Sequence, residues 1–473
     1  MKRSTSLLKS LLLALPLLLG LTGFLTAGES FPDSLFSSIC MYAMNYQDPP
    51  PNLWVEAGRW TAPLATASGI LAAASALRGR LRVFLRGCRG NSVAVYGPEP
   101  ERAALLDQLG RRGIDGGSRL VRAQQYILLG DDALDFYTRH RAGLEGVEVY
   151  AQCGALPAQS VSDPGLRLFC PEETAARLFW KAQSLYAYSA ARGHRLNIVL
   201  LGFGRLGEEL LTHGLLDNLF SPDQRIAYHI FGDGGAFPAV HTQLEEIGDP
   251  VRFYDVPWYT QLPLLEEADR ILVLQQEDQL SLLQSLLLAT CRPRFQVFAA
   301  ETAGIQLLAG RERLDLFHWR REAQSLPNIL SDAMYRRAKR VNLRYAHLYD
   351  GVPEDRENQE AQWARLDAFT RYSNISAADY HEVRLAMLEA LGASPDGLSP
   401  ALLELLAELE HIRWCRYHLL NNWRRGVPEN GKRKDPARRL HADLVPYREL
   451  TEAEREKDRE NIRVLLSIQN LYS

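Results

Sequence analysis

Most of the chain alternates between short apolar segments and longer segments in which apolar positions recur at helical spacing. From about residue 91 the short segments have the length of buried strands, and the longer ones the length of helices. Strands that alternate with helices are typical of βαβ units on a parallel sheet. We therefore expect an α/β fold with two successive Rossmann-like units. The first takes its strands from residues 92–96, 125–129, 147–153 and 166–170, followed by a long helix at 171–191; the second takes its strands from residues 198–201, 225–231, 251–255, 270–275, 295–299 and 314–318.

The first ninety residues differ, because they contain two long uncharged segments. Residues 10–28 form a leucine-rich segment of 19 residues, and residues 60–77 form a second segment of 18. About 20 apolar residues are needed to cross a bilayer as a helix. We expect a two-span, multi-pass hairpin in the cell membrane, with the lipid bilayer as a partner. The positive-inside rule places both termini in the cytoplasm, because basic residues flank the hairpin on its outer sides: Lys2, Arg3 and Lys9 before it, and Arg78, Arg80, Arg82, Arg86 and Arg89 after it.

A cleaved signal peptide is the alternative for the first segment, which has a basic start, a leucine core and Ala27 near its end. Leu25 is larger than the residue usually found at a small-x-small cleavage site, and this favours two spans. Between the spans, residues 31–46 are short and largely apolar, and they begin with a Pro32-Asp33 helix start. We expect either a re-entrant pore helix or an interfacial helix there.

A glycine-rich turn lies at the start of the second unit, where LNIVLLGFGRLGEELL spans residues 196–211. Gly202, Gly204 and Gly207 follow a predicted strand and open a predicted helix, which is the context in which G-x-G-x-x-G is informative. The first glycine permits the tight turn, the second lets the backbone approach a pyrophosphate, and the third allows close packing of helix and strand. The helix N-terminus then faces the anion. The alternative is a Rossmann-like fold that keeps the turn and binds nothing.

Two further residues complete this candidate nucleotide site. Asp233 follows the second strand of the unit, where an acid accepts hydrogen bonds from ribose hydroxyls. Arg205 lies inside the glycine motif. In the first unit the corresponding turn reads Gly97-Pro98-Glu99-Pro100-Glu101, with prolines and acids where phosphate would bind. We therefore expect the first unit to be a Rossmann shape without a phosphate site.

Composition narrows the function classes. The formal net charge is −3 with 23% charged residues, so no global field attracts nucleic acid, and none is expected as a partner. Six scattered cysteines without a C-x-x-C pair indicate neither a zinc site nor a disulfide framework.

Two predicted spans, an arginine-rich exit and tandem Rossmann-like units with GFGRLGEELL together resemble the TrkA-N or RCK architecture. The resemblance covers about residues 10–349. It implies a cytoplasmic regulatory domain attached to a potassium channel or transporter, with NAD or a related nucleotide bound at the glycine turn. It also implies a homo-oligomer, such as a tetramer. The chain lacks the TVGYG-type filter of potassium channels.

The C-terminal block follows a basic helix at 332–349 and an acidic segment that we interpret as a linker. It reads EHIRW at 410–414, NWRRG at 422–426 and LVPY at 444–447, then an acidic-basic helix with Lys457-Asp458. This order is similar to the RyR domain, named for repeats in ryanodine receptors. Asn422 and Ala442 depart from the usual Gly and Pro of that pattern. The resemblance implies recognition of a nucleotide-derived signal.

Candidate ligand residues of this block are aromatic and basic. A flat ring stacks a base or holds a cation, and an arginine pairs with phosphate. The alternative is that the aromatic residues are the core of a small helical domain. The candidates are His411, Trp414, Trp423, Arg424 and Tyr447.

A membrane-tethered NAD-dependent oxidoreductase is the rival class, and a non-conducting signalling adaptor is another. His213, His229, His241 and His318 are available, but none lies in a recognisable catalytic constellation, so no enzyme activity is expected. The interpretation is a membrane-anchored, ligand-gated sensor. Its predicted parts are a hairpin at 1–90, a degenerate Rossmann-like domain at 91–194, a nucleotide-binding domain at 195–349, a linker at 350–365 and a RyR-like domain at 366–473.

Overall fold

The computed structural model describes residues 2–45, 52–117, 119–161, 165–183, 185–300, 303–308, 310–330, 334–429 and 431–469. The chain divides into two compact units. The smaller comprises Met1–Ala94 with Val121–Gln124, and the larger comprises Val95–Leu120 with Gln125–Ser473.

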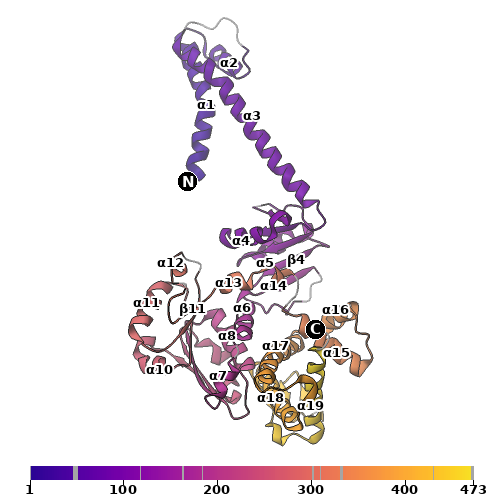
Figure 1. Cartoon of the computed structure of the whole chain (residues 1–473). Coiled ribbons are helices and arrows are strands. Elements are labelled where there is room, and N and C mark those ends of the chain that lie inside the picture. Colours follow the sequence, from indigo (N-terminus) through magenta and orange to yellow (C-terminus); the bar gives the residue numbers. More distant parts are fainter. Residues whose placement is uncertain are drawn as a thin grey trace. The chain divides into compact units, whose positions relative to one another are not determined.

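Three helices make up most of the smaller unit: α1 (Lys2–Thr26), α2 (Phe31–Tyr42) and α3 (Leu53–Gly87), which Figure 1 shows in indigo and violet. Ser30 caps α2, as the expected helix start requires. The predicted end of this helix, Tyr46, lies outside the described residues. The Tyr42 hydroxyl donates to the Leu13 carbonyl over 2.6 Å and ties α2 to α1.

Only α3, in the described part of the chain, is long and apolar enough to cross a membrane. It contains the predicted span at 60–77 and continues through the arginines as far as Gly87. The apolar stretch found in α1, Leu13–Thr26, is shorter, so the first span and the hairpin topology stay predictions. Large apolar side chains on both helices are exposed, among them Leu18, Trp60, Leu64, Ile70 and Leu77.

The first α/β region has a five-stranded sheet in the order β2-β1-β3-β4-β5. This is the 2-1-3-4-5 order of one of the common doubly wound folds. The sequence did not predict β2, because this short strand buries a single large apolar residue, Ile114. The strands are β1 (Val93–Tyr96), β2 (Gly113–Asp115), β3 (Gln125–Leu128), β4 (Glu148–Gln152) and β5 (Leu166–Phe169), and the helices are α4 (Glu99–Leu109) and α5 (Ala133–His140).

The second α/β region has a six-stranded parallel sheet in the order β11-β10-β9-β6-β7-β8. Numbered along the chain, this is the Rossmann order 3-2-1-4-5-6, with the reversal of strand order between β6 and β9. The predicted α/β class with parallel sheets is thus confirmed. The strands are β6 (Arg195–Leu201), β7 (Arg225–Phe231), β8 (Val251–Tyr254), β9 (Arg270–Val273), β10 (Phe295–Phe298) and β11 (Leu314–Phe317).

Eight helices accompany this second region. The predicted long helix at 171–191 is two helices, because Gln183 leaves helical geometry after Ala182. The helices are α6 (Pro171–Ala182), α7 (Tyr186–Ala190), α8 (Gly204–Asp217), α9 (Ala236–Val240), α10 (Leu262–Glu266), α11 (Gln279–Ala289), α12 (Ala303–Gln306) and α13 (Trp319–Ala323); α14 (Leu326–Leu330) leads on to the C-terminal helices.

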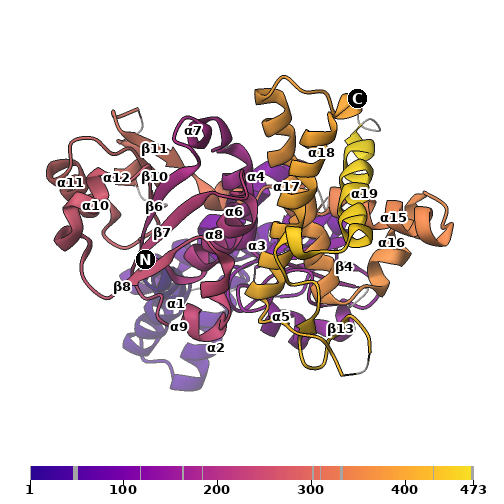
Figure 2. The same ribbon diagram turned by 90° about the horizontal axis from the view of Figure 1, so that it is seen from below.

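Helices dominate the C-terminal part, and Figure 2 shows α17, α18 and α19 side by side. The expected linker at 350–365 contains a helix, α16, which packs against α15 and buries Trp363. The expected basic helix is α15, and residues 332 and 333 of that prediction lie outside the described ones. The helices are α15 (Arg336–Asp350), α16 (Arg356–Arg365), α17 (Ala368–Ala390), α18 (Pro400–Leu420) and α19 (Glu452–Gln469), with short strands β12 (Arg424–Arg425), β13 (Lys434–Asp435) and β14 (Leu440–His441).

The Rossmann-ordered region and the C-terminal helices share one hydrophobic core. It joins Leu210 of α8 to Tyr380 of α17 and Leu409 of α18, each fully buried. The described regions around α8, α17 and α18 are therefore packed as one body of protein rather than as separate modules.

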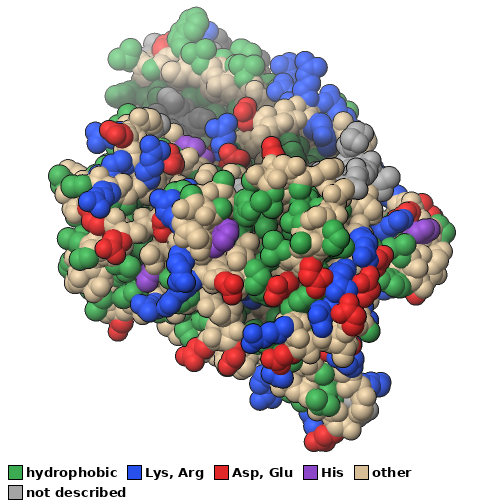
Figure 3. All heavy atoms as spheres, turned by 60° about the horizontal axis from the view of Figure 1, so that its bottom comes forward, with side chains coloured by type: hydrophobic (Ala, Val, Ile, Leu, Met, Phe, Trp, Pro, Cys, Tyr) green, Lys and Arg blue, Asp and Glu red, His purple; other side chains and the backbone are tan. Residues whose placement is uncertain are grey.

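Figure 3 shows acidic and basic side chains interspersed over the face that it draws.

Candidate functional site

The glycine turn between β6 and α8 has the geometry of a nucleotide-binding turn. Gly202 has φ +90°, and a Cβ there would lie 2.7 Å from the backbone nitrogen of Gln275. Gly204 has φ +57°, and a Cβ there would meet no heavy atom within 4 Å. The first glycine is therefore needed for the turn itself, whereas the second faces open space at the start of α8. A helix N-terminus with open space beside it is suited to an anion.

Gly207 and Asp233 also occupy the expected places. A Cβ on Gly207 would lie 2.7 Å from the ring of Phe203, so this glycine allows close packing. Asp233 is exposed just beyond the end of β7. The roles of Gly202, Gly204, Gly207 and Asp233 in binding a nucleotide stay predictions.

Arg205 is held by acids of its own helix. Its guanidinium lies 2.6 Å from Glu209 and 3.4 Å from Glu208. It lines a cavity on the flank of α8, described below. In this structure Arg205 therefore pairs with carboxylates, and its predicted contact with a nucleotide is untested.

The corresponding turn of the first α/β region is closed by an internal ion pair. The Arg102 guanidinium donates to the Gly97 carbonyl over 2.6 Å and lies 3.2 Å from Asp115 at the end of β2. A Cβ on Gly97 would lie 2.6 Å from Leu129. The side chains of Arg102 and Asp115 thus occupy the space beside this turn. In the second unit the space beside Gly204 is open.

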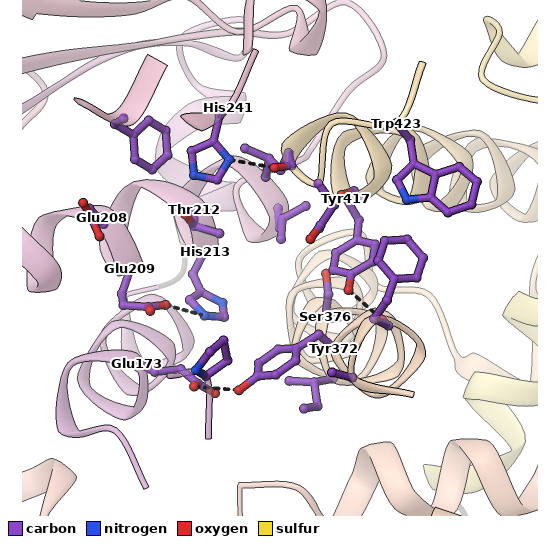
Figure 4. Close-up of a pocket in the computed structure, with 18 of the residues that line it drawn as sticks. Glu173, Glu208, Glu209, Thr212, His213, His241, Tyr372, Ser376, Tyr417 and Trp423 are labelled. Atoms are coloured by element: carbon purple, nitrogen blue, oxygen red, sulfur yellow. Dashed lines mark hydrogen bonds and ion pairs between the residues drawn. The ribbon is translucent and has the colours of Figure 1, made fainter. Parts of the chain in front are cut away.

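A second feature is a cavity of about 520 Å³ between α8 and the C-terminal helices. Figure 4 shows Glu209, Thr212 and His213 of α8 on one side, facing Tyr372, Ser376 and Tyr417 of α17 and α18. Its walls thus come from segments far apart in the sequence. Gly202, Gly204, Gly207 and Asp233 are not among its lining residues.

Polar groups along α8, Glu209 and His213 among them, form one edge of this cavity, whereas Asp217 does not line it. Glu209, His213 and Asp217 are spaced at i, i+4 and i+8 and so lie on one helix face. The Nε2 of His213 lies 3.6 Å from Glu209, and its Nδ1 lies 4.0 Å from Asp217. Burial, and then the nearby charge of Glu173, raise the pKa of Glu209 to about 8. Burial lowers the pKa of His213 to about 4, so this imidazole is neutral at pH 7.

Aromatic side chains form the opposite edge. The ring of Trp423 stacks on Phe369 with 5.4 Å between ring centroids, and Phe369 lies 5.0 Å from Tyr417. Trp423 is only 7% exposed. The tryptophan predicted as a ligand platform is therefore both a packed residue and part of the cavity wall.

The other candidates of the C-terminal block do not line this cavity. Arg424 is exposed, as is its neighbour Arg425 in the two-residue strand β12. Trp414 is half-buried beside His418, with 4.0 Å between ring centroids. Tyr447 is buried in the core formed by α18 and α19. Four of the five predicted residues nevertheless belong to one group of ring contacts, in which His411 lies 5.8 Å from Trp414 and 5.9 Å from Tyr447 between ring centroids. Trp414 and Trp423 both contact the ring of His418. The role of these residues in binding a ligand stays a prediction.

His411 is a buried, charged link within the same block. Its Nε2 donates to the Val445 carbonyl over 2.8 Å, and its Nδ1 lies 3.4 Å from Asp458. Burial opposes protonation, but hydrogen bonds to Asp458 and Cys415 outweigh it and raise the pKa to about 10. His411 therefore ties the LVPY segment and α19 to α18.

Sequence reasoning missed the cavity, because its walls meet only in the folded chain. The sequence pattern assigns no role to Glu209, and it gives His213 no distinction from the other scattered histidines. The available signal was the polar row at i, i+4 and i+8 on a helix whose other buried residues are leucine and glycine. No cluster of three or more His, Cys, Asp or Glu suited to a metal occurs among the described residues.

Comparison with known proteins identifies one domain. The RyR domain family model matches residues 398–471, which confirms the RyR resemblance of the C-terminal block. No curated protein matches the chain. The TrkA-N or RCK resemblance stays a prediction.

Two solved structures are similar at low identity. The L-tryptophan dehydrogenase of Nostoc punctiforme is 13% identical with a TM-score of 0.25, over 70% of this chain and 87% of that chain. The NAD-dependent formate dehydrogenase of Staphylococcus aureus, in complex with NAD, is 10% identical with a TM-score of 0.21, over 56% of this chain and 97% of that chain. Scores this low carry no argument about function. The chain is thus an α/β protein with a Rossmann strand order and a C-terminal RyR domain.

Proposed function

We propose that this chain is a membrane-anchored ligand sensor in which NAD or a related nucleotide binds at the glycine turn. The observation that carries the proposal is the position of α8. This helix begins at the open Gly204 turn, and its flank packs against the helices of the RyR-domain block. A nucleotide at one end of α8 and a ligand of the RyR domain would therefore act on the same packed element.

Hydrogen bonds across this junction support coupling between the two inputs. The Arg416 guanidinium on α18 lies 2.8 Å from the Leu215 carbonyl and 2.8 Å from Asp249. The Tyr380 hydroxyl on α17 donates to the Leu219 carbonyl over 2.7 Å. Because these contacts are buried, a shift of α8 has to repack α17 and α18.

The membrane helices are the output element of this proposal. The chain continues from α3 through the arginines into the first sheet, so rearrangement of the cytoplasmic part is transmitted along one covalent segment. The short α2 packs against both α1 and α3. Several copies of this hairpin in a homo-oligomer would form an ion pathway, for potassium if the TrkA-N or RCK resemblance extends to transport.

Nucleotide binding is tested with the full chain in detergent, by calorimetry with NAD, NADH, ATP and ADP. Gly204→Ala places a methyl group in the open space where phosphate is expected. Gly193→Ala is a matched control, because Gly193 has φ +59° and also has nothing within 4 Å of its Cβ position. We expect Gly204→Ala to weaken binding by about tenfold or more, since it blocks close approach of the backbone. Gly193→Ala should leave binding unchanged.

Three results would contradict the proposal. If the parent binds no nucleotide, the turn is structural only. Equal loss in both variants would mean that backbone strain, rather than phosphate contact, explains the effect. Steady NADH turnover with a small substrate would put the oxidoreductase class first.

The output is tested separately by ion flux into proteoliposomes that contain the purified chain. We expect flux that changes when the bound nucleotide is added. Ligand binding without any flux would support the signalling-adaptor class instead.

A further inference from the structure

The cavity between α8 and the α17–α18 pair is built from two regions that the nucleotide proposal treats as separate inputs. On α8 its lining runs from Arg205 to Leu216, which corresponds to about 16 Å along a helix axis. The facing wall is supplied by α17 and α18. The glycine turn lies outside it, so the cavity is a distinct place for a ligand.

Acidic groups predominate at this cavity. Arg205 pairs with Glu208 and Glu209, and Glu173 lies 3.7 Å from Arg177, which is not a lining residue. Arg439 donates to the Asn421 carbonyl. The charged lining residues are the four acids Glu173, Glu208, Glu209 and Asp367 and the two arginines Arg205 and Arg439.

His213 gives an independent sign of a missing ligand. Its side chain projects into the cavity (Figure 4), and it is only 6% exposed. Its Nδ1 has no hydrogen-bond partner among the described residues. Buried polar atoms are normally hydrogen-bonded, and an orphaned one calls for an explanation. A bound molecule that supplies a hydrogen-bonding group would satisfy it.

The aromatic wall presents ring faces rather than hydroxyl groups. The Tyr417 hydroxyl donates to the Phe369 carbonyl over 2.6 Å, and the Tyr372 hydroxyl donates to Glu173 over 2.9 Å. Their polar ends are thus occupied within the protein. Phe369 covers one face of Trp423, and the sides of these rings that line the cavity are suited to stack a planar ring or attract a cation.

We propose that this cavity binds a planar organic cation, of the class of protonated amino-heterocycles. The cationic nitrogen would lie against Glu209 and His213, with Glu209 releasing its proton to solvent as the cation binds, and the ring would lie against the aromatic wall. Because the acids exceed the arginines, a phosphate-bearing ligand is disfavoured here. The inference is independent of nucleotide binding at the glycine turn.

The test uses three quinolines that share one ring and differ in charge. The compound 4-aminoquinoline is a cation at neutral pH, quinoline is neutral, and quinoline-4-carboxylate is an anion. Binding to the full chain in detergent is measured by calorimetry. We expect 4-aminoquinoline to bind about tenfold or more tightly than either of the other two, since only its charge adds a charge-assisted hydrogen bond to Glu209.

Variants locate the site. Glu209→Gln keeps the shape and removes the group that would ionise when the cation binds, and it should weaken binding of the cation by about tenfold while leaving quinoline unchanged. Thr212→Leu fills space next to His213 without changing charge, and it should weaken binding of all three compounds. The exposed Glu245→Gln is the charge-matched control and should have no effect.

Several outcomes overturn the proposal. One is that none of the three compounds binds to the parent chain. Another is that the carboxylate binds as tightly as the amine. A third is that Glu209→Gln and Thr212→Leu, each shown to be folded by its melting temperature, bind the amine as the parent does. Nucleotide binding, measured in the same samples, is unaffected by these outcomes.

Discussion

At the scale of single residues, Glu209 combines burial with unusual protonation. Burial comes first, and the charges of Glu173, Glu208 and Glu172 add to it, whereas Arg205 acts in the opposite direction. The result is a pKa raised from 4.5 to about 8. The neighbouring His213 remains neutral at pH 7 because burial lowers its pKa to about 4. These two residues make the cavity a place where a proton and a bound cation compete.

This protonation predicts how stability depends on pH. A carboxyl whose pKa is higher in the folded chain than in the unfolded chain binds its proton preferentially in the folded state. Its contribution is present below about pH 4.5 and is lost as the pH rises through about 8. We expect Glu209→Gln to melt at the same temperature as the parent near pH 5 and at a higher temperature near pH 8.5. Each unit of pKa shift corresponds to about 1.4 kcal/mol.

The measurement is a series of thermal melts of the full chain between those two pH values. Other groups also titrate in this range, among them His411 in the unfolded chain, where its pKa is near 6.5. These groups are the same in both proteins, so their contributions to the difference in melting temperature cancel. A difference in melting temperature that does not change with pH would contradict the raised pKa of Glu209.

Residue-scale prediction from the sequence succeeded where the residue acts through backbone geometry. Gly202 and Gly204 were predicted to lie in a turn between strand and helix, and both have positive φ there, because a G-x-G turn specifies its own conformation locally. Trp423 shows the opposite case. Its pairing with Phe369 joins the end of α18 to the start of α17, and no local pattern indicates that contact.

At the scale of elements, α1 and α3 approach closely because both carry glycine at their contact. A Cβ on Gly58 would lie 3.2 Å from the backbone nitrogen of Gly20 and 3.3 Å from the Pro16 carbonyl. On the other side of the contact, a Cβ on Gly23 would lie 2.5 Å from Val55. Small residues that let helix backbones approach are typical of helix pairs in membranes. The pairing of α1 with α3 therefore depends on these glycines.

We expect Gly58→Leu to separate the two helices, with a cost of about 1–3 kcal/mol for overpacking. Separation is measured as the yield of a disulfide between Thr26→Cys and Asn52→Cys, which replace two side chains 2.8 Å apart. Gly69→Leu in the same helix is the control, because a Cβ there has a single contact, with Leu13 at 3.9 Å. Equal yields for Gly58→Leu and the control would show that the glycine contact does not hold the helices together.

The accuracy with which each helix or strand was predicted depended on how regular the pattern of apolar and polar residues is in that segment. Strand β7 was predicted with its observed bounds, because an apolar run between polar flanks specifies a buried strand. Helix α16 was interpreted as linker, because Trp363 is its single buried apolar residue and gives no periodicity. The break between α6 and α7 was also missed, since the apolar pattern continues across it.

At the scale of the whole molecule, the sequence predicted separate domains that follow one another along the chain. In the structure some of these domains pack against each other through a shared hydrophobic core. The second α/β region and the C-terminal helices share a core that no boundary at 349 or 365 would divide cleanly. Tertiary packing of this kind depends on which surfaces meet, and pattern reasoning on one chain does not supply that. The order of the parts along the chain, by contrast, was predictable from composition and periodicity.

Orientation in the membrane is a whole-molecule property that follows from charge at the two ends of the hairpin. Lys2, Arg3 and Lys9 precede the first apolar segment, and the arginines from Arg78 to Arg89 follow the second. Lysine and arginine near the ends of a span are retained on the cytoplasmic side. Both outer flanks are basic, and the connection at 29–59 has Arg59 as its one basic residue. The turn after α1 should therefore lie outside the cell, and the end of α3 inside.

Two single-thiol chains test this orientation in intact cells with a membrane-impermeant maleimide. One carries Ala27→Cys, at an exposed position just after α1, and the other keeps only the native Cys88, which is exposed at the end of α3. The thiol introduced by Ala27→Cys should be labelled in intact cells, and Cys88 only after permeabilisation, because the bilayer separates the two ends of α3. Labelling of Cys88 from outside would reverse the topology. A mature chain that begins at Gly28 would show that the first segment is a cleaved signal peptide, and α3 would then be a lone span whose arginine-rich end still faces the cytoplasm.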